Sequence, residues 1–364
     1  MCGAEMKYVK DVFESNWIAP VGPYIEKFEK GLSLISNNYS VAALSSGTAA
    51  IHLALILLNI KAGDSVLCSS FTFAASANPI KYLGANPIFI DSERETWNMC
   101  PKLLERAIID SKSKGVLPKA IILVHLYGMP AKIEEIIKIS AKYKIPVIED
   151  VAEAIGSKYN GIPLGTFGKF GIYSFNGNKI ITASTGGALF SKDKKLIEYS
   201  KKLSTQARDK APHYEHSDIG YNYRLSNICA AIGFGQLEIL TDRINKKREI
   251  FNFYKTKLSK IDDIEFLDEN ENIFSNFWLT TILLRRESTI DREDLRLYLS
   301  KNNIESRPLW KPMHLQPVFK FYDAYINGVS EDLFNRGLCL PSDTNMKNED
   351  LNMVVNKIKE IYAA

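Results

Sequence analysis

The chain has 364 residues, 46% of them hydrophobic and 24% charged, which is long enough for two domains or one large unit with a sizeable core. The formal net charge is +4, and because the charges are spread along the chain, they exclude the basic block that is typical of nucleic-acid-binding and membrane-surface proteins. No apolar stretch approaches the roughly 18 residues of a membrane span, and no apolar signal segment opens the chain, so we expect a cytoplasmic protein.

Short apolar runs and longer amphipathic segments alternate from about residue 40 to residue 192. This alternation is typical of an α/β protein in which helices cover both faces of a mostly parallel sheet. We expect strands over residues 41–44, 66–68, 87–90, 120–124, 147–148, 170–175 and 188–191. We expect helices after residue 48 and near residues 72–83, 101–112, 131–143 and 194–206.

The pattern changes in the last third of the chain. A long helical segment is predicted over residues 226–257, with a break near residue 241, and it is followed by a strand over 277–284 and helices over 292–302 and 348–362. These elements indicate a smaller α+β domain. We therefore predict a large domain over residues 1–240 and a small domain over residues 241–364, tightly packed because no flexible linker joins them.

A candidate anion site lies where the first strand leads into its helix. Ser46-Gly47-Thr48 offers free backbone N–H groups, a small residue that permits close approach, and two hydroxyl groups. Alone the tripeptide is a weak signal, because a helix N-cap without a ligand explains most tripeptides of this kind.

Two acids end the strand at 147–148. Glu149 and Asp150 lie at the carboxyl edge of a buried strand, where ligands of open α/β sheets bind. Alternatively, both acids cap the following segment, with Glu153 exposed on its first turn.

Lys179 is the candidate nucleophile. It lies between Gly177-Asn178 and Ile180-Ile181, directly after an apolar strand. Burial lowers the pKa of a lysine and so supplies the neutral amine that carbonyl chemistry needs. A loop lysine that extends to the solvent is the alternative.

The histidines and cysteines do not indicate a metal. The five cysteines are far apart and show no paired spacing, so we interpret them as small apolar residues. His213, Glu215 and His216 lie close together, but nothing nearby completes a metal site.

Taken together, several motifs resemble the DegT/DnrJ/EryC1/StrS family of pyridoxal-phosphate sugar aminotransferases. The resemblance covers nearly the whole chain and rests on ordered motifs at residues 46–50, 70–73, 125–128, 149–153, 174–179, 220–226 and 307–314. It implies a fold-type I aminotransferase, an α/β fold with a mostly parallel central sheet and a smaller C-terminal α+β domain. The cofactor would be pyridoxal 5'-phosphate (PLP).

The resemblance also implies roles for individual residues. Lys179 would bond to the cofactor and do the proton work of catalysis, and Asp150 would pair with the pyridinium nitrogen so that the ring acts as an electron sink. The other expected cofactor contacts are Gly47, Thr48 and Ser174 at the phosphate, Phe73 on the ring, Glu153 beside the 3-hydroxyl group, and Asn222 at the phosphate of the partner subunit. The expected assembly is therefore a homodimer with shared active sites.

The substrates follow from the same resemblance. Segments 204–208, 213–216 and 307–314 look most like the branch that acts on UDP-linked 4-keto-6-deoxy-2-acetamido sugars, the bacillosamine-type transaminases. We expect transfer of an amino group from glutamate to the C4 keto group of such a sugar. The candidates for sugar-nucleotide binding are Arg307, Trp310, His314 and His213.

Several alternatives stay open. A 3-amino or GDP-perosamine-type transaminase, a sugar 3-dehydratase or a non-catalytic regulator could share the fold, although the dehydratases carry histidine where this chain has Lys179. A nicotinamide oxidoreductase would need a Gly-x-Gly-x-x-Gly turn after the first strand, which is absent. The chain departs from its relatives at residues 182–188, where a Gly-rich run is usual, and at its start, which lacks their short extended lead.

Overall fold

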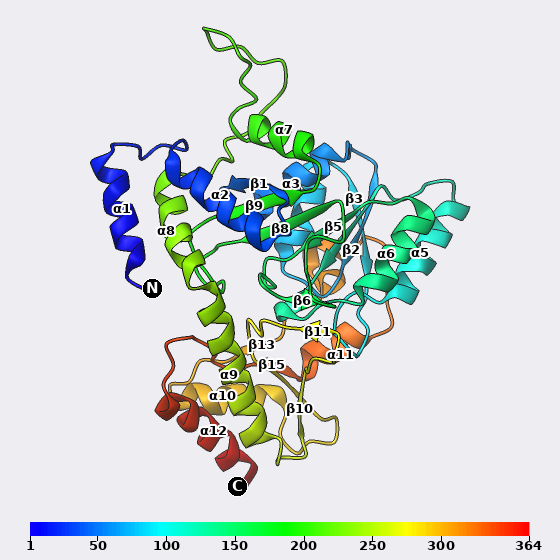
Figure 1. Cartoon of the computed structure of the whole chain (residues 1–364). Coiled ribbons are helices and arrows are strands. Elements are labelled where there is room, and N and C mark those ends of the chain that lie inside the picture. The colour runs from blue at the N-terminus through cyan, green and yellow to red at the C-terminus, as the bar shows by residue number, and fades with distance from the viewer. Residues whose placement is uncertain (364) are drawn as a thin grey trace.

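An eight-stranded sheet forms the centre of the larger part of the molecule (Figure 1). The computed structural model describes residues 1–363. The strand order is β1-β9-β8-β5-β4-β2-β3-β14, and β9 alone among them runs antiparallel to its neighbours within the described residues. The strands are β1 (Ser40–Leu44), β2 (Ser65–Ser69), β3 (Asn86–Ile90), β4 (Ala120–Val124), β5 (Val147–Asp150), β8 (Phe170–Ser174), β9 (Gly187–Ser191) and β14 (Ala324–Tyr325).

Helices cover both faces of this sheet because successive side chains of its buried strands point to opposite faces. On β4, Ile122 packs with helix α3, whereas Ile121 and Leu123 pack with α5 and α6. The helices of this part are α1 (Ala4–Glu14), α2 (Pro23–Ile35), α3 (Gly47–Leu57), α4 (Asn78–Tyr82), α5 (Pro101–Ser113), α6 (Ile133–Tyr143), α7 (Lys194–Ser204) and α8 (Asn227–Glu238). Short 3₁₀ turns are η1 (Ala74–Ser76) and η2 (Leu126–Gly128). The α/β class and the mostly parallel sheet expected from the sequence are thus confirmed.

A second, antiparallel sheet with the order β10-β12-β15-β13 organises the C-terminal part. Its core joins α9, α10 and α12 to the sheet through residues such as Ile250, Leu295 and Val354. The elements are α9 (Leu240–Leu258), β10 (Ile264–Phe266), β12 (Thr281–Leu284), α10 (Arg292–Lys301), β13 (Arg307–Pro308), η3 (Met313–Leu315), η4 (Pro317–Phe319), α11 (Val329–Arg336), β15 (Gly337–Cys339) and α12 (Asn348–Ala363). A small third sheet joins β6 (Lys158–Tyr159), β7 (Ile162–Pro163) and β11 (Ile273–Phe274).

Chain segments cross between the two parts. β14 pairs with β3 at the edge of the large sheet, and β11 pairs with β6. The predicted boundary at residue 240 coincides with the start of α9, but the division into two domains stays a prediction. Along residues 1–363, no helix combines the length and the apolar character needed to cross a membrane.

Two sequence-based element predictions need correction, and a third is confirmed. The helix expected over 72–83 is only η1 and α4, and the preceding Phe71–Phe73 segment is not helical. The strand expected over 277–284 begins at Thr281, because Phe277 has a φ of 44° that no strand can contain. The long helix is broken at Ile239, close to the expected position.

Candidate active site

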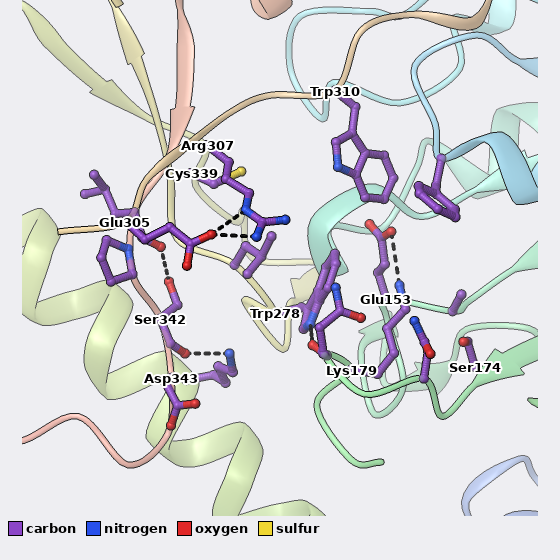
Figure 2. A pocket seen from close by; sticks show the side chains of 18 of the residues that line it. Glu153, Ser174, Lys179, Trp278, Glu305, Arg307, Trp310, Cys339, Ser342 and Asp343 are labelled. Carbon is purple, nitrogen blue, oxygen red and sulfur yellow. Dashed lines mark hydrogen bonds and ion pairs between the residues drawn. The ribbon is translucent and has the colours of Figure 1, made fainter. Parts of the chain in front are cut away.

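A cavity of about 1060 Å³ lies at the carboxyl ends of the large sheet's parallel strands and extends to the C-terminal part (Figure 2). Chain segments that follow β1, β5 and β8 supply one wall, and residues 303–310 and 339–343 supply the other. The carboxyl edge of an open α/β sheet is the general place for a ligand. The cavity contains nine of the predicted site residues, namely Gly47, Thr48, Phe73, Asp150, Glu153, Ser174, Lys179, Arg307 and Trp310.

The start of helix α3 forms one end of the cavity. Ser46 caps the helix by accepting a hydrogen bond from the Ala49 N–H at 3.0 Å. A Cβ atom on Gly47 would lie only 3.2 Å from the Ser174 Cβ, so the absence of a side chain keeps the helix start close to β8. The unpaired N–H groups and positive dipole of a helix N-terminus, next to the hydroxyl of Ser174, suit a phosphate group.

The segment that departs from the usual Gly-rich run supports this helix start. Gly186 forms a bridge with Ser46, and the Thr185 hydroxyl donates to the Ser45 carbonyl oxygen at 2.8 Å. A Cβ on Gly187 would lie 2.3 Å from the Gly47 nitrogen. The two glycines at 186 and 187 therefore let the backbone approach the anion end of the cavity.

The two acids at the end of β5 have different surroundings. Glu149 is fully buried and accepts hydrogen bonds from three backbone N–H groups, at Gly165, Phe167 and Gly168. It also pairs with His125, whose Nε2 lies 3.1 Å from a Glu149 oxygen. Because the Ala131 N–H donates to the other ring nitrogen of His125, Nε2 carries the proton. Glu149 and His125 thus form a buried structural pair.

Asp150, by contrast, lines the cavity. Its Oδ2 accepts a hydrogen bond from the Ser76 hydroxyl at 2.7 Å, and its Oδ1 accepts one from the Ala152 N–H at 3.1 Å. These two bonds fix the orientation of a carboxylate that is 5% exposed. A fixed carboxylate at this place suits a protonated ring nitrogen.

Lys179 points toward Glu153 from the loop after β8 (Figure 2). Its Nζ lies 3.5 Å from a Glu153 oxygen and 4.2 Å from the centre of the Trp278 ring. Burial raises the pKa of Glu153 to about 7, although the attraction of Lys179 and a hydrogen bond from the Tyr127 N–H at 2.7 Å lower it. The site therefore holds the Lys179 amine next to a carboxyl group, that of Glu153, whose pKa lies near neutral pH.

Aromatic side chains form the remaining wall. Phe73 is 59% exposed and lies 5.4 Å from the Trp310 ring, centre to centre. The backbone N–H of Trp310 donates to the Tyr127 hydroxyl at 3.0 Å. Arg307 lies on β13, pairs with Glu305 at 2.5 Å and is largely exposed, so it stays accessible to a ligand.

Three predicted residues do not line the cavity of this chain. His314 bonds to the Ser70 hydroxyl through Nδ1 at 2.6 Å and lies behind the cavity wall. Asn222 and His213 belong to the segment between α7 and α8, part of which extends away from the body of the molecule (Figure 1). Asn222 lies at the base of this segment, where it bridges to Thr205 beside the end of α7. Asn222 accepts a hydrogen bond from Gln206 there, and His213 pairs with Glu215.

Sequence reasoning missed Tyr127, Asn276 and Trp278, which contact Glu153 or Lys179 or hold their neighbours in place. Tyr127 falls inside the motif at 125–128, so its position carried a signal. Asn276 and Trp278 lie about 100 residues beyond Lys179. Trp278 falls in the segment 277–284 that was predicted as a strand, and Asn276 lies just before that segment. Only the folded chain brings them to the site.

The donor set fits PLP. The helix start with Ser174 can take the phosphate, Asp150 the ring nitrogen, Lys179 the aldehyde, and Phe73 one face of the ring. The position of Phe73 is informative because a phenyl ring exposed inside a cavity is available for stacking.

Comparisons with known proteins place the whole chain among sugar aminotransferases. The model of the DegT/DnrJ/EryC1/StrS aminotransferase family matches residues 2–359. EpsN of Bacillus subtilis (strain 168), named as a pyridoxal phosphate-dependent aminotransferase, is 51% identical over all of this chain and 94% of its own length. The GDP-perosamine synthase of Escherichia coli O157:H7 is 40% identical over all of this chain and 97% of its own. The crystal structure of a DegT DnrJ EryC1 StrS aminotransferase from Brucella abortus superimposes with a TM-score of 0.92 at 30% identity, covering 99% of this chain and 96% of that one.

Proposed function

Because the chain belongs to the DegT/DnrJ/EryC1/StrS aminotransferase family and is a PLP-dependent sugar aminotransferase of fold-type I, we propose that it transfers the amino group of glutamate to the C4 keto group of a nucleotide-linked 4-keto-6-deoxysugar. The finer proposal is a UDP-linked 2-acetamido-2,6-dideoxy-4-ketohexose, for the synthesis of a bacterial surface glycan or glycoprotein sugar. The observation that supports the amino transfer is the meeting of Lys179, Asp150 and the helix α3 start in one cavity of about 1060 Å³. The finer proposal rests on the resemblance of segments 204–208, 213–216 and 307–314.

The bound cofactor supplies an electron sink for the carbanion that forms when the donor loses its Cα proton. Asp150 holds the proton on the ring nitrogen, which keeps that sink effective. Gly47, Thr48 and Ser174 hold the phosphate, and Phe73 covers one face of the ring.

Lys179 moves the proton. Its Nζ would take the proton from the donor Cα and deliver it to the carbon of the cofactor's aldehyde group. It would do the reverse when the ketosugar replaces the donor. Glu153, 3.5 Å away, holds the amine in place between these transfers.

For the sugar nucleotide we propose Arg307 and Trp310, which line the cavity, with Arg307 suited to a diphosphate. His314, His213 and Asn222 stay proposals that need either a rearrangement or a second subunit, because they lie outside the cavity of one chain. We propose a homodimer in which Asn222 of each subunit contacts the phosphate in the other subunit's site.

A GDP-linked substrate is the second candidate. The 40% identity to a GDP-perosamine synthase over the whole chain favours it, because that relative's name specifies a GDP-linked product. The two candidates differ in the nucleotide and in the group at C2.

A ketosugar panel tests the proposal. The enzyme is first converted with glutamate to its amino-loaded form, freed of small molecules, and then mixed with UDP-, GDP- and dTDP-linked 4-ketosugars while its visible absorbance is followed. Recovery of the long-wavelength band with the UDP-linked acetamido sugar supports the finer proposal, and recovery with the GDP sugar alone replaces it with the second candidate.

Two variants make the panel specific. Lys179→Ala controls for absorbance changes that do not involve the amine. Arg307→Ala should slow the ketosugar step and leave the glutamate step unchanged, because only the ketosugar carries a diphosphate. Conversion by glutamate without recovery on any of the three sugars would overturn both substrate candidates.

A further inference from the structure

Trp278 contacts both Lys179 and the residue before it, Asn178. Its ring centre lies 4.2 Å from Lys179 Nζ, and its indole N–H donates a hydrogen bond to the carbonyl oxygen of Asn178 at 2.9 Å. The side chain is 2% exposed. A single rigid, buried ring therefore contacts both the amine and the peptide group that precedes the lysine (Figure 2).

Asn276 fixes the place of Trp278. Its Oδ1 accepts a hydrogen bond from the backbone N–H of Trp278 at 2.9 Å. Its Nδ2 donates to the backbone carbonyl oxygens of Glu153 and Ile155, each at 2.9 Å. Asn276 is fully buried. It therefore links the backbones of the two residues, Glu153 and Trp278, whose side chains contact the Lys179 amine.

Phe277, the residue between Asn276 and Trp278, is held in an unfavourable backbone conformation. Phe277 has a φ of 44°, in the left-handed region that a bulky side chain rarely adopts. Its ring stacks on Phe251 of α9 at 3.7 Å with an interplanar angle of 6°, so packing holds it there. Strained backbone that surrounding structure maintains is concentrated at functional sites.

We propose that Trp278 is a positioning residue for Lys179, and that Asn276 sets its place together with that of Glu153. The proposal rests on the proposed role of Lys179. When Lys179 is not bonded to the cofactor, its ammonium group lies between the Glu153 carboxylate and the face of the indole ring. Both attract the cation, so the amine is held at one place on the cavity wall, beside the reacting atoms.

The test measures the reactivity of Lys179 in the cofactor-free protein. Reductive methylation with formaldehyde and cyanoborohydride is followed by peptide mass spectrometry, and the rate at Lys179 is divided by the rate at the exposed Lys7. Removal of the ring in Trp278→Leu should raise this ratio roughly 2- to 30-fold, the range that corresponds to a cation–π contact. Trp278→Phe keeps a ring face and should stay within about twofold of the wild type.

Two further variants separate positioning from loss of structure. Trp97 is also a buried tryptophan, so Trp97→Phe is the matched control and should leave the ratio unchanged. Asn276→Ala should raise the ratio as Trp278→Leu does, and the double variant should show less than the product of the two effects, because the substitutions act through the same contact. Should Trp278→Leu not fold, Trp278→Met gives the same contrast of bulk without a ring.

Equal ratios in the wild type and in a folded Trp278→Leu would overturn the proposal, as would Leu and Phe variants that behave alike. The proposed function is tested separately by reduction of the PLP-loaded wild type with borohydride. A pyridoxyl group on another lysine would refute the role of Lys179, whatever the methylation ratios are.

Discussion

Asp150 is held by two hydrogen bonds and lines the cavity, so its charge is the property that a substitution can change selectively. Asp150→Asn keeps the size and one acceptor but cannot hold a proton on a ring nitrogen. An ion pair at 4 Å contributes about 4 kcal/mol at an effective dielectric constant of 20, so we expect the glutamate half-reaction to slow by up to roughly a thousandfold. Stopped-flow absorbance measures it, and a near wild-type rate would make Asp150 only a cap of the following turn.

Glu153 makes the stability of the cofactor-free protein depend on pH. Since burial raises its pKa from 4.5 to about 7, the folded state binds the proton more tightly than the unfolded chain. Stability should therefore fall as the pH rises from about 4.5 to about 7, by up to roughly 3 kcal/mol from this group.

Glu153→Gln should remove this part of the slope in denaturant titrations between pH 5 and pH 8. Gln can still accept the Tyr127 N–H. The exposed Glu305 supplies the control variant Glu305→Gln, which should leave the slope unchanged. Parallel curves for wild type and Glu153→Gln would show that another group causes the pH dependence.

The sequence predicted those site residues that have a local signal, and it missed those that only long-range packing brings to the site. Lys179, Asp150 and the Gly47-Thr48 turn each lie next to a strand end, and strand ends meet at one edge of a parallel sheet. Their convergence was therefore predictable. Trp278 and Asn276 act from a loop whose position depends on long-range packing, and no local pattern indicates that position. The site assignments as a whole stay predictions.

At the scale of elements, the junction of β9 with the start of α3 controls the anion end of the cavity. In Gly187→Ala the new Cβ would lie 2.3 Å from the Gly47 nitrogen and must displace backbone atoms. Overpacking of this kind costs about 1–3 kcal/mol, so we expect PLP to bind roughly 5- to 150-fold more weakly in absorbance titrations of the cofactor-free protein.

Gly177→Ala is the matched control, since a Cβ there would meet no atom within 4 Å although the residue lies two positions from Lys179. Unchanged PLP affinity in a folded Gly187→Ala protein would mean that the helix start does not hold the phosphate.

Regular elements were predictable where periodicity is strong, and errors arose where a few residues override it. The buried parallel strands and the helices over residues 101–113 and 292–301 follow their apolar spacing. Phe277 belongs to an apolar run but cannot join β12, because its backbone is held in the left-handed region. The deviation at residues 182–188 from the usual Gly-rich run still leaves Gly187, the glycine that the close approach to Ser46 and Gly47 requires.

At the scale of the whole molecule, part of the segment between α7 and α8 stands away from the body (Figure 1), and Asn222 lies at the base of that segment, where it bridges to Thr205. If each site takes Lys179 from one subunit and Asn222 from the other, a hybrid of Lys179→Ala and Asn222→Ala chains has one site with both substitutions and one with neither. Random pairing makes half of the dimers hybrids, so co-refolding should restore about one quarter of the wild-type activity.

The two mutant homodimers, refolded alone, are the controls and have no intact site. The measurement is the specific activity of the mixture together with native mass spectrometry, which shows that hybrids form. A mixture that is no more active than the average of its homodimers, although hybrids are present, would place Asn222 outside a shared site.

The contact between Trp278 and Lys179 also has a consequence during synthesis of the chain. About 100 residues separate the two side chains, so a ribosome that adds roughly 5–20 residues per second makes Trp278 about 5 to 20 s after Lys179. In that interval the large sheet can form, but β14, Asn276 and Trp278 are still missing. The nascent chain thus passes through a stage in which its reactive lysine exists without the ring that holds it, and a competent cofactor site can arise only late in translation.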